Sequence, residues 1–184
     1  MIEVKNVTKS FEDKTVLFDI STKFHEGKTN LIIGQSGSGK TVLVKSIIGL
    51  VTPEKGEILY DGRDLMKMNT EKRKTLRKEI GMLFQGSALF DSETVLGNVM
   101  FPLKMFERMT YAEMRDRAEF CLERVNLKGA NDKYPAEISG GMQKRVAIAR
   151  AIALNPQYLF CDEPNSGLDP KTSLVIDDLI HDIT

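Results

Sequence analysis

The chain lacks the residues and runs that mark several classes of protein. Its 184 residues include no Trp, two Cys, and equal numbers of basic and acidic side chains, 26 of each. With a formal charge of zero, the chain as a whole attracts neither nucleic acid nor an anionic membrane. Cys121 and Cys161 form no CxxC pair, which argues against a disulfide framework or a zinc site. No apolar run approaches the roughly 18 residues of a membrane span, and no signal pattern opens the chain, so we expect a soluble intracellular domain.

Short apolar runs separated by turns predict an α/β domain with a parallel core. We expect strands at residues 16–24, 29–33, 57–60, 81–84 and 158–161. We expect helices at residues 41–50, 110–125, 141–154 and 170–183. The segment 63–79 holds seven Lys or Arg but no aromatic residue to stack on bases, so a solvated helix face is favoured over nucleic-acid contact.

A complete G-x-x-x-x-G-K-[ST] motif lies between an apolar strand pattern and a helix pattern. It is formed by Gly34, Gln35, Ser36, Gly37, Ser38, Gly39, Lys40 and Thr41. Glycines let successive backbone N–H groups turn inward around a phosphate at a helix N-terminus. Lys40 is expected to reach the β- and γ-phosphates, and the Thr41 hydroxyl to bind Mg²⁺.

Two carboxylates, Asp162 and Glu163, follow the apolar run 158–161. A carboxylate at the end of a buried strand is costly unless a cation or hydrogen bonds compensate it. The metal implied by the phosphate loop supplies that compensation. We therefore expect Asp162 to hold Mg²⁺ and Glu163 to polarise an attacking water.

A second glycine-rich helix start lies at Ser139, Gly140 and Gly141, before a basic helix pattern. Free N–H groups and the helix dipole would make it another anion site, although an ordinary helix cap is the alternative. Two separate phosphate sites suggest a nucleotide held between two subunits.

In this order, the motifs resemble those of ABC-type ATPases, the nucleotide-binding subunits of transporters, over essentially the whole chain. The resemblance implies a P-loop NTPase fold of the ABC type. Such a fold has a mixed or parallel core sheet, N-terminal antiparallel strands and an inserted helical subdomain. It divides the chain into residues 1–85, the N-terminal part of the ATP-binding core, 86–150, the helical subdomain, and 151–184, an incomplete return to the core.

The resemblance also assigns roles to single residues. Gln85 matches a glutamine that contacts Mg²⁺ or the lytic water and senses the membrane partner. Phe11 matches the aromatic residue that stacks on adenine, with a core position as its alternative. Residues 139–143 match the signature motif, which contacts the γ-phosphate bound by the opposite subunit, and residues 166–169 match a loop that crosses the dimer interface.

Together these assignments imply an ATPase that uses ATP and Mg²⁺, dimerises around two nucleotides and drives an integral membrane permease from the inner face of the membrane. The implied catalytic residues are Lys40, Gln85 and Glu163, and the implied Mg²⁺ ligands are Thr41, Gln85 and Asp162. The permease is expected on the Met- and Phe-rich surface around residues 87–106, with core packing as the alternative. No nucleic-acid partner is expected.

Within the family, several stretches resemble the bacterial ATPases of Mla/Mce-type phospholipid transporters. The features behind this resemblance are Val42 after the phosphate loop, Met142 in place of the usual glutamine in the signature, and residues 86–90 after Gln85.

The chain departs from the family pattern at its end, where the pattern continues with a further core strand and a switch histidine. His181 lies inside the helix pattern 170–183 and is no substitute. We therefore expect a fragment of a longer protein. Two rival functions stay open: a soluble ABC protein of DNA repair or translation, and a nucleotide-binding module that does not hydrolyse ATP.

Overall fold

The computed structural model describes residues 1–183, and its internal contacts divide the chain into two compact units. The first unit spans Met1–Arg77, and the second runs from Lys78 to the end of the described chain. None of the described helices combines the length and apolar character that a membrane span needs.

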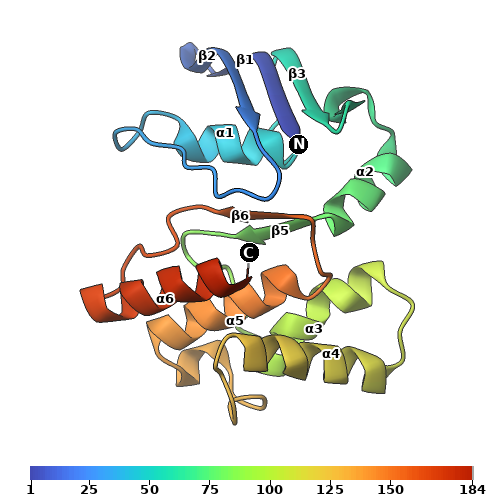
Figure 1. Cartoon of the computed structure of the whole chain (residues 1–184), viewed down its shortest axis with the longest axis vertical. Coiled ribbons are helices and arrows are strands. Elements are labelled where there is room, and N and C mark those ends of the chain that lie inside the picture. Colours follow the sequence, from blue (N-terminus) through green and yellow to red (C-terminus); the bar gives the residue numbers. More distant parts are fainter. Residues whose placement is uncertain (184) are drawn as a thin grey trace. The chain divides into compact units, whose positions relative to one another are not determined.

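The first unit is built on an antiparallel sheet with the strand order β2-β1-β3-β4 (Figure 1). Its strands are β1 (Ile2–Phe11), β2 (Lys14–Phe24), β3 (Lys55–Tyr60) and β4 (Arg63–Asp64). Ile2 on the central strand β1 pairs with Phe24 on one side and Tyr60 on the other. The side chains of Ile2, Val4 and Val7 are buried, as are those of Ile58 and Tyr60 opposite them. The alternation of apolar residues along these strands thus marks the face that forms the core.

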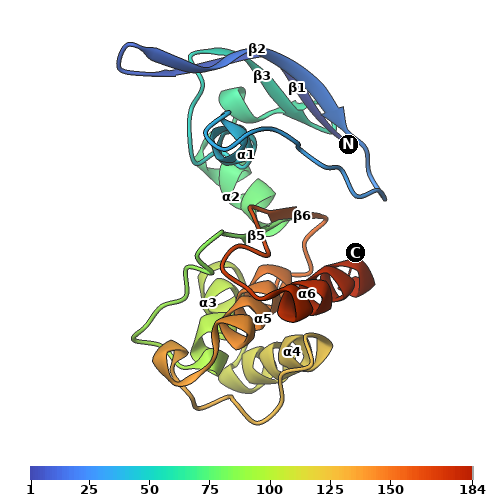
Figure 2. The same ribbon diagram turned by 90° about the vertical axis from the view of Figure 1, so that its left-hand side faces the viewer.

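Helix α1 (Lys40–Ile47) lies along one face of this sheet in both views (Figures 1 and 2). The buried Tyr60 hydroxyl donates to the Ile47 carbonyl at 2.9 Å, which ties the C-terminal end of the helix to β3. A short 3-10 helix, η1 (Leu65–Lys67), and helix α2 (Thr70–Lys78) complete the unit. Only Leu76 of α2 is buried, so the solvated basic helix predicted within 63–79 is confirmed.

The strand predicted at residues 29–33 is wrong. These residues form no regular structure, and the side chains of Leu31 and Ile33 are 79% and 84% exposed. A strand needs neighbours to bond its N–H and C=O groups, and among residues 1–183 no strand pairs with this segment. The apolar run alone therefore does not specify a strand here.

In the second unit, helices pack around α5 and together cover one side of a small parallel sheet (Figures 1 and 2). Its elements are β5 (Ile80–Leu83), α3 (Val95–Phe106), α4 (Tyr111–Arg124), η2 (Pro135–Glu137), α5 (Gly140–Ile152), β6 (Tyr158–Cys161) and α6 (Pro170–Ile183). Helix α5 contacts α3, α4, α6 and β5, and its residues Val146, Ala147, Ile148 and Ala149 are almost completely buried. The helices predicted at 110–125, 141–154 and 170–183 are confirmed within a few residues.

Strands β5 and β6 pair in parallel, with Ile80 opposite Tyr158 and Leu83 opposite Cys161. The carboxyl ends of parallel strands meet at one edge of a sheet, so Gln85 and Asp162 leave this sheet side by side. The Asp162 N–H donates to the Leu83 carbonyl at 2.9 Å and extends the pairing by one step.

Candidate functional site

The phosphate loop 34–41 lies in the first unit, and backbone geometry explains its glycines. Gly37 and Gly39 have φ angles of 78° and 96°, in the left-handed region that favours glycine. At Gly39 a Cβ would also lie 3.0 Å from the Val16 carbonyl and 3.1 Å from the Leu17 side chain of β2. A larger residue at Gly39 would push the start of α1 away from the sheet.

The Lys40 side chain folds back over its own loop. Its ammonium donates to the carbonyls of Gly34 and Gln35 at 2.9 and 3.0 Å, and the Ser38 N–H donates to the Gln35 carbonyl at 3.2 Å. The predicted loop–helix junction is therefore present, with its lysine at the first position of α1. A phosphate bound by Lys40 would take the place of these two carbonyls.

Phe11 ends β1 in the same unit. Its ring is 46% exposed, and the Lys9 ammonium lies 5.0 Å from the ring centroid. An exposed ring of this kind can stack on a planar ligand, whereas a core residue would be covered. The exposure favours the stacking role over the core alternative.

In the second unit, Gln85 and Glu163 meet at the edge where β5 and β6 end. The Gln85 side-chain amide donates to the Glu163 carboxylate at 2.7 Å and to the Ser166 hydroxyl at 3.3 Å. Glu163 has a φ of 48°, which is uncommon for a residue with a side chain and is a form of local strain found at functional sites. Asp162 beside it is only 7% exposed. Three predicted site residues are thus brought together.

The donor set predicted for Mg²⁺ consists of hard oxygen ligands, which suit this ion. Thr41 offers a hydroxyl, Gln85 an amide oxygen, and Asp162 a buried carboxylate that gains from a cation. Within residues 1–183 no group of three or more His, Cys, Asp or Glu could hold a metal. A single carboxylate supplemented by phosphate oxygens remains the usual way in which proteins hold Mg²⁺ with a nucleotide.

Burial also acts on the thiol next to Asp162. It raises the pKa of Cys161 to about 11, while the nearby Lys144 ammonium acts in the opposite direction. The thiol is therefore neutral at physiological pH and is not activated as a nucleophile.

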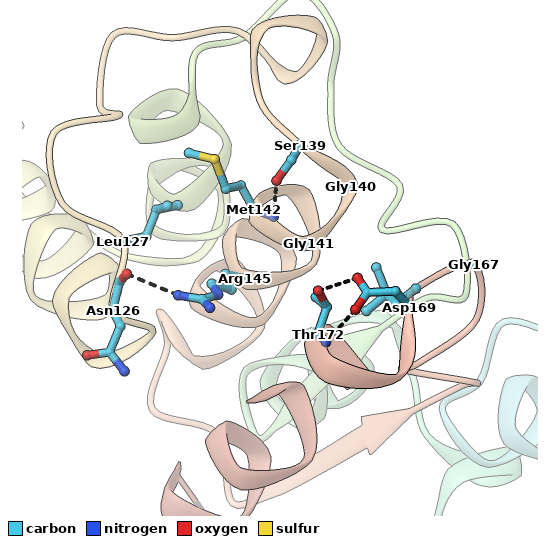
Figure 3. A pocket seen from close by; sticks show the side chains of 11 residues that line it. Asn126, Leu127, Ser139, Gly140, Gly141, Met142, Arg145, Gly167, Asp169 and Thr172 are labelled. Carbon is cyan, nitrogen blue, oxygen red and sulfur yellow. Dashed lines mark hydrogen bonds between the residues drawn. The ribbon is translucent and has the colours of Figure 1, made fainter. Parts of the chain in front are cut away.

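The signature residues open helix α5 beside a cavity of about 510 Å³ (Figure 3). The Ser139 hydroxyl caps the helix by accepting from the Met142 N–H at 3.3 Å. Gly141 lies against α6, because a Cβ there would stand 2.8 Å from the Thr172 methyl group. Arg145 lines the same cavity, and its guanidinium donates to the Asn126 carbonyl at 3.2 Å.

The loop 166–169 supplies the opposite wall of this cavity through Gly167, Leu168 and Asp169. Asp169 caps α6 by accepting from the Thr172 hydroxyl at 2.5 Å and from the backbone N–H groups of Lys171 and Thr172 at 3.0 and 3.1 Å (Figure 3). These bonds, above all that from the Thr172 hydroxyl, lower the pKa of the Asp169 carboxyl. The two predicted loops therefore line one hollow that is large enough for part of a ligand.

The stretch 87–106 divides between buried and exposed residues. Val95, Val99, Met100 and Leu103 are buried in the core of the second unit. By contrast, Phe90, Phe101 and Met105 are 40%, 36% and 56% exposed, and the rings of Phe90 and Phe101 lie 4.5 Å apart. One face of α3 is thus core, and the other is an apolar surface.

Three residues that bond the chain between β5 and α3 were missed by the sequence analysis: Asn98, Lys144 and Arg150. The Asn98 amide bonds backbone groups of residues 90–94, and the two cations bond carbonyls of residues 85–88. The pattern 144–150 is visibly basic, but no sequence signal indicates that two of its cations turn inward.

Comparison with known proteins agrees with these features. The family model described as ABC transporter matches residues 17–166. The chain is 43% identical over 182 residues, 99% of its length, to a probable ribonucleotide transport ATP-binding protein of Mycobacterium leprae, and it covers 52% of that protein. It is 42% identical, over 98% of its length, to the intermembrane phospholipid transport ATP-binding protein MlaF of Haemophilus influenzae, and covers 68% of it. The chain thus spans about half the length of several curated relatives.

A solved structure of a bacterial ABC transporter cassette, MJ0796 in its dimeric form, matches with a TM-score of 0.90 and 36% identity. The match covers 98% of this chain and 81% of that one. The predicted ABC-type P-loop fold is confirmed by this match. The chain belongs to the ABC transporter family as an ATP-binding domain.

Proposed function

We propose that the protein binds ATP through the phosphate loop 34–41 and hydrolyses it with Glu163 as the carboxylate that polarises water. The observation that carries the proposal is the 2.7 Å hydrogen bond from Gln85 to Glu163 at the shared edge of β5 and β6, in a chain with a complete phosphate loop. Lys40 would bind the β- and γ-phosphates, and Phe11 would stack on the adenine.

Thr41, Gln85 and Asp162 would hold Mg²⁺, which neutralises phosphate charge when bound. In this proposal residues 1–85 and 151–184 belong to the ATP-binding core, and 86–150 form the helical subdomain. Ser139, Gly140 and Gly141 would contact the nucleotide of a second copy, so two copies would close around two ATP molecules. The dimeric state of the related MJ0796 cassette supports this arrangement.

Substitution of the polarising carboxylate tests hydrolysis. Glu163→Gln keeps the side-chain shape but removes the charge, so we expect ATP binding within about twofold of wild type and a loss of hydrolysis of at least about 100-fold. The ATP-bound variant should elute as a dimer in size-exclusion chromatography. Glu123→Gln is the matched control, since Glu123 lies on α4 and pairs with Lys128 at 3.1 Å. A Glu163→Gln protein that hydrolyses ATP as fast as wild type would rule out this role for the carboxylate.

The permease would dock on the exposed apolar face of Phe90, Phe101 and Met105, at the inner face of the cell membrane. Met105→Asp should abolish co-purification with the permease. It should leave ATP binding unchanged, because Met105 is 56% exposed and lies outside the phosphate loop 34–41. Tyr111→Asp, at another exposed apolar site on α4, should leave both unchanged. Retention of the permease by the Met105 variant contradicts this docking surface.

We propose phospholipid as the cargo of the permease. Curated relatives at 41–43% identity are named for ribonucleotide, methionine and phospholipid transport, so identity alone does not select among them. The resemblance of residues 86–90 and Met142 to Mla/Mce-type ATPases favours phospholipid. ATPase activity of the reconstituted complex should rise with phospholipid and stay constant with methionine or ribonucleotides. The opposite response would select another cargo.

A further inference from the structure

Two cations of helix α5 anchor the Gln85 loop, which we define as residues 85–88. The Lys144 ammonium donates to the Gln85 carbonyl. The Arg150 guanidinium donates through Nη1 to the Ala88 carbonyl and through Nη2 to the Ser87 carbonyl, both at 2.7 Å. One helix therefore holds three of the four carbonyls of this loop.

One of these anchors, Lys144, is a buried cation, and the other, Arg150, is a partly buried one. Lys144 is only 4% exposed, and burial lowers the pKa of both Lys144 and Arg150. Neither makes an ion pair within residues 1–183. A buried cation that lacks a carboxylate is unfavourable unless hydrogen bonds compensate it, and here the loop carbonyls provide that compensation.

The loop itself has a conformation that needs external support. Ser87 and Ala88 have φ angles of 61° and 48°, so two successive residues with side chains occupy the left-handed region. Such a conformation persists only where the surroundings impose it. The Arg150 fork bonds the carbonyls of these same two residues, and its guanidinium lies 5.8 Å from the centroid of the Phe90 ring, just beyond the loop.

The same helix also borders the cavity of the signature motif. Gly140, Gly141, Met142 and Arg145 line that cavity at the N-terminal end of α5, and Lys144 lies one residue before Arg145 on the helix. A ligand that displaces this end of α5 would therefore displace a residue bonded directly to Gln85.

We propose that Lys144 and Arg150 are positioning residues, which fix the Gln85 amide against Glu163 and pass movements of α5 to it. The proposal rests on the proposed role of Gln85 in ATP hydrolysis. Its geometric basis is the chain of contacts from the α5 side chains to the loop carbonyls, and from the Gln85 amide to Glu163 at 2.7 Å.

A double-mutant cycle separates positioning from general support. Lys144→Met keeps an unbranched side chain but removes the donor, and in the protein purified at its native length we expect kcat to fall about tenfold with a KM for ATP within about twofold. In a Gln85→Ala background the same change should cost nothing further, because the amide that Lys144 positions is gone. Lys144→Arg restores a donor and should recover most of the activity.

Arg117→Met is the matched control. Arg117 also donates to carbonyls at the C-terminal end of α5, those of Ile152 and Ala153 at 3.1 and 2.9 Å, and these carbonyls lie outside the Gln85 loop. Any effect of Arg117→Met on kcat should be the same in the wild-type and Gln85→Ala backgrounds. If Lys144→Met lowers kcat by the same factor with and without Gln85→Ala, its role is structural and the proposal is overturned.

A readout without catalysis separates this proposal from the proposed function. In protein labelled with ¹⁵N-glutamine and free of nucleotide, Lys144→Met should shift the side-chain amide resonance of Gln85, and Arg117→Met should leave it in place. An unshifted resonance overturns the positioning role whether or not the protein hydrolyses ATP. Absence of hydrolysis in wild type alongside a shifted resonance overturns only the proposed function. If Lys144→Met does not fold, Arg150→Lys, which keeps one donor and loses the fork, is tested for the same resonance shift.

Discussion

Replacement of Asn98 by Leu should remove the support of the chain between β5 and α3. Asn98 is completely buried, and its amide accepts from the Phe90 N–H at 2.8 Å and donates to the carbonyls of Phe90, Glu93 and Thr94 at 3.0–3.1 Å. The Phe90 and Thr94 carbonyls keep a second bond, from the N–H groups of Glu93 and Asn98. The Phe90 N–H and the Glu93 carbonyl lose the partner that the structure gives them.

The expected cost follows from these two groups. A fully buried group left without a partner costs about 1–3 kcal/mol, and the two bonds lost here are only part-buried, so the free energy of unfolding should fall by about 2 kcal/mol. For a chain of this size the midpoint of thermal unfolding should fall by roughly 4–8 °C. Leu has the same branched arrangement of heavy atoms as Asn with bulkier methyl groups, so no cavity adds to the loss.

Urea denaturation followed by circular dichroism measures this change. Asn131→Leu is the control, because Asn131 is partly buried and its side-chain amide donates to the Glu119 carboxylate at 3.1 Å, and it should cost less than about 1 kcal/mol. A loss of less than about 1 kcal/mol in Asn98→Leu would refute the reasoning, since the two orphaned groups would then have found other partners.

Three further changes test other parts of the molecule. Lys40→Met should weaken ATP binding at least about 100-fold in calorimetry with an unchanged unfolding midpoint, because the bonds of Lys40 in the structure are exposed; unchanged affinity contradicts its phosphate role. Gly81→Ala places a Cβ 2.4 Å from the Ala151 carbonyl and should cost about 1–3 kcal/mol in denaturant, whereas Gly86→Ala meets nothing within 4 Å and should be tolerated. For Cys161 the folded pKa is raised from 9.0 to about 11, so the neutral thiol stabilises the fold below pH 9 and this contribution of about 2–3 kcal/mol is lost as the pH rises through 11. Unfolding curves of wild type and Cys161→Ala should therefore converge over that range, and parallel pH profiles would contradict the assignment.

Features coded by neighbouring residues could be predicted from the sequence. The phosphate loop is one contiguous motif, and the solvated helix α2 follows from a segment in which only Leu76 is apolar enough to bury. The nearness of Gln85 and Asp162 was also predicted, since the resemblance assigns both residues to one Mg²⁺ site.

Features that depend on distant partners could not be predicted in the same way. The run 29–33 has the composition of a buried strand, but a strand exists only where a neighbour pairs with it. Lys144 and Asn98 are polar residues that composition assigns to the surface, and only the folded chain brings backbone groups to them. Sequence motifs can thus predict most residues of a site, whereas the residues that support the site are found only in the structure.

The exposure of Leu31 and Ile33 has a consequence for the entropy of nucleotide binding. The phosphate loop continues into α1 on one side, but on the other it is preceded by residues that belong to no sheet of the described chain. If a ligand orders these residues, the lost conformational entropy reduces the free energy of binding by about 1–2 kcal/mol for each residue that becomes fixed. Anything that pairs with residues 31–33 beforehand would therefore raise nucleotide affinity without touching the nucleotide.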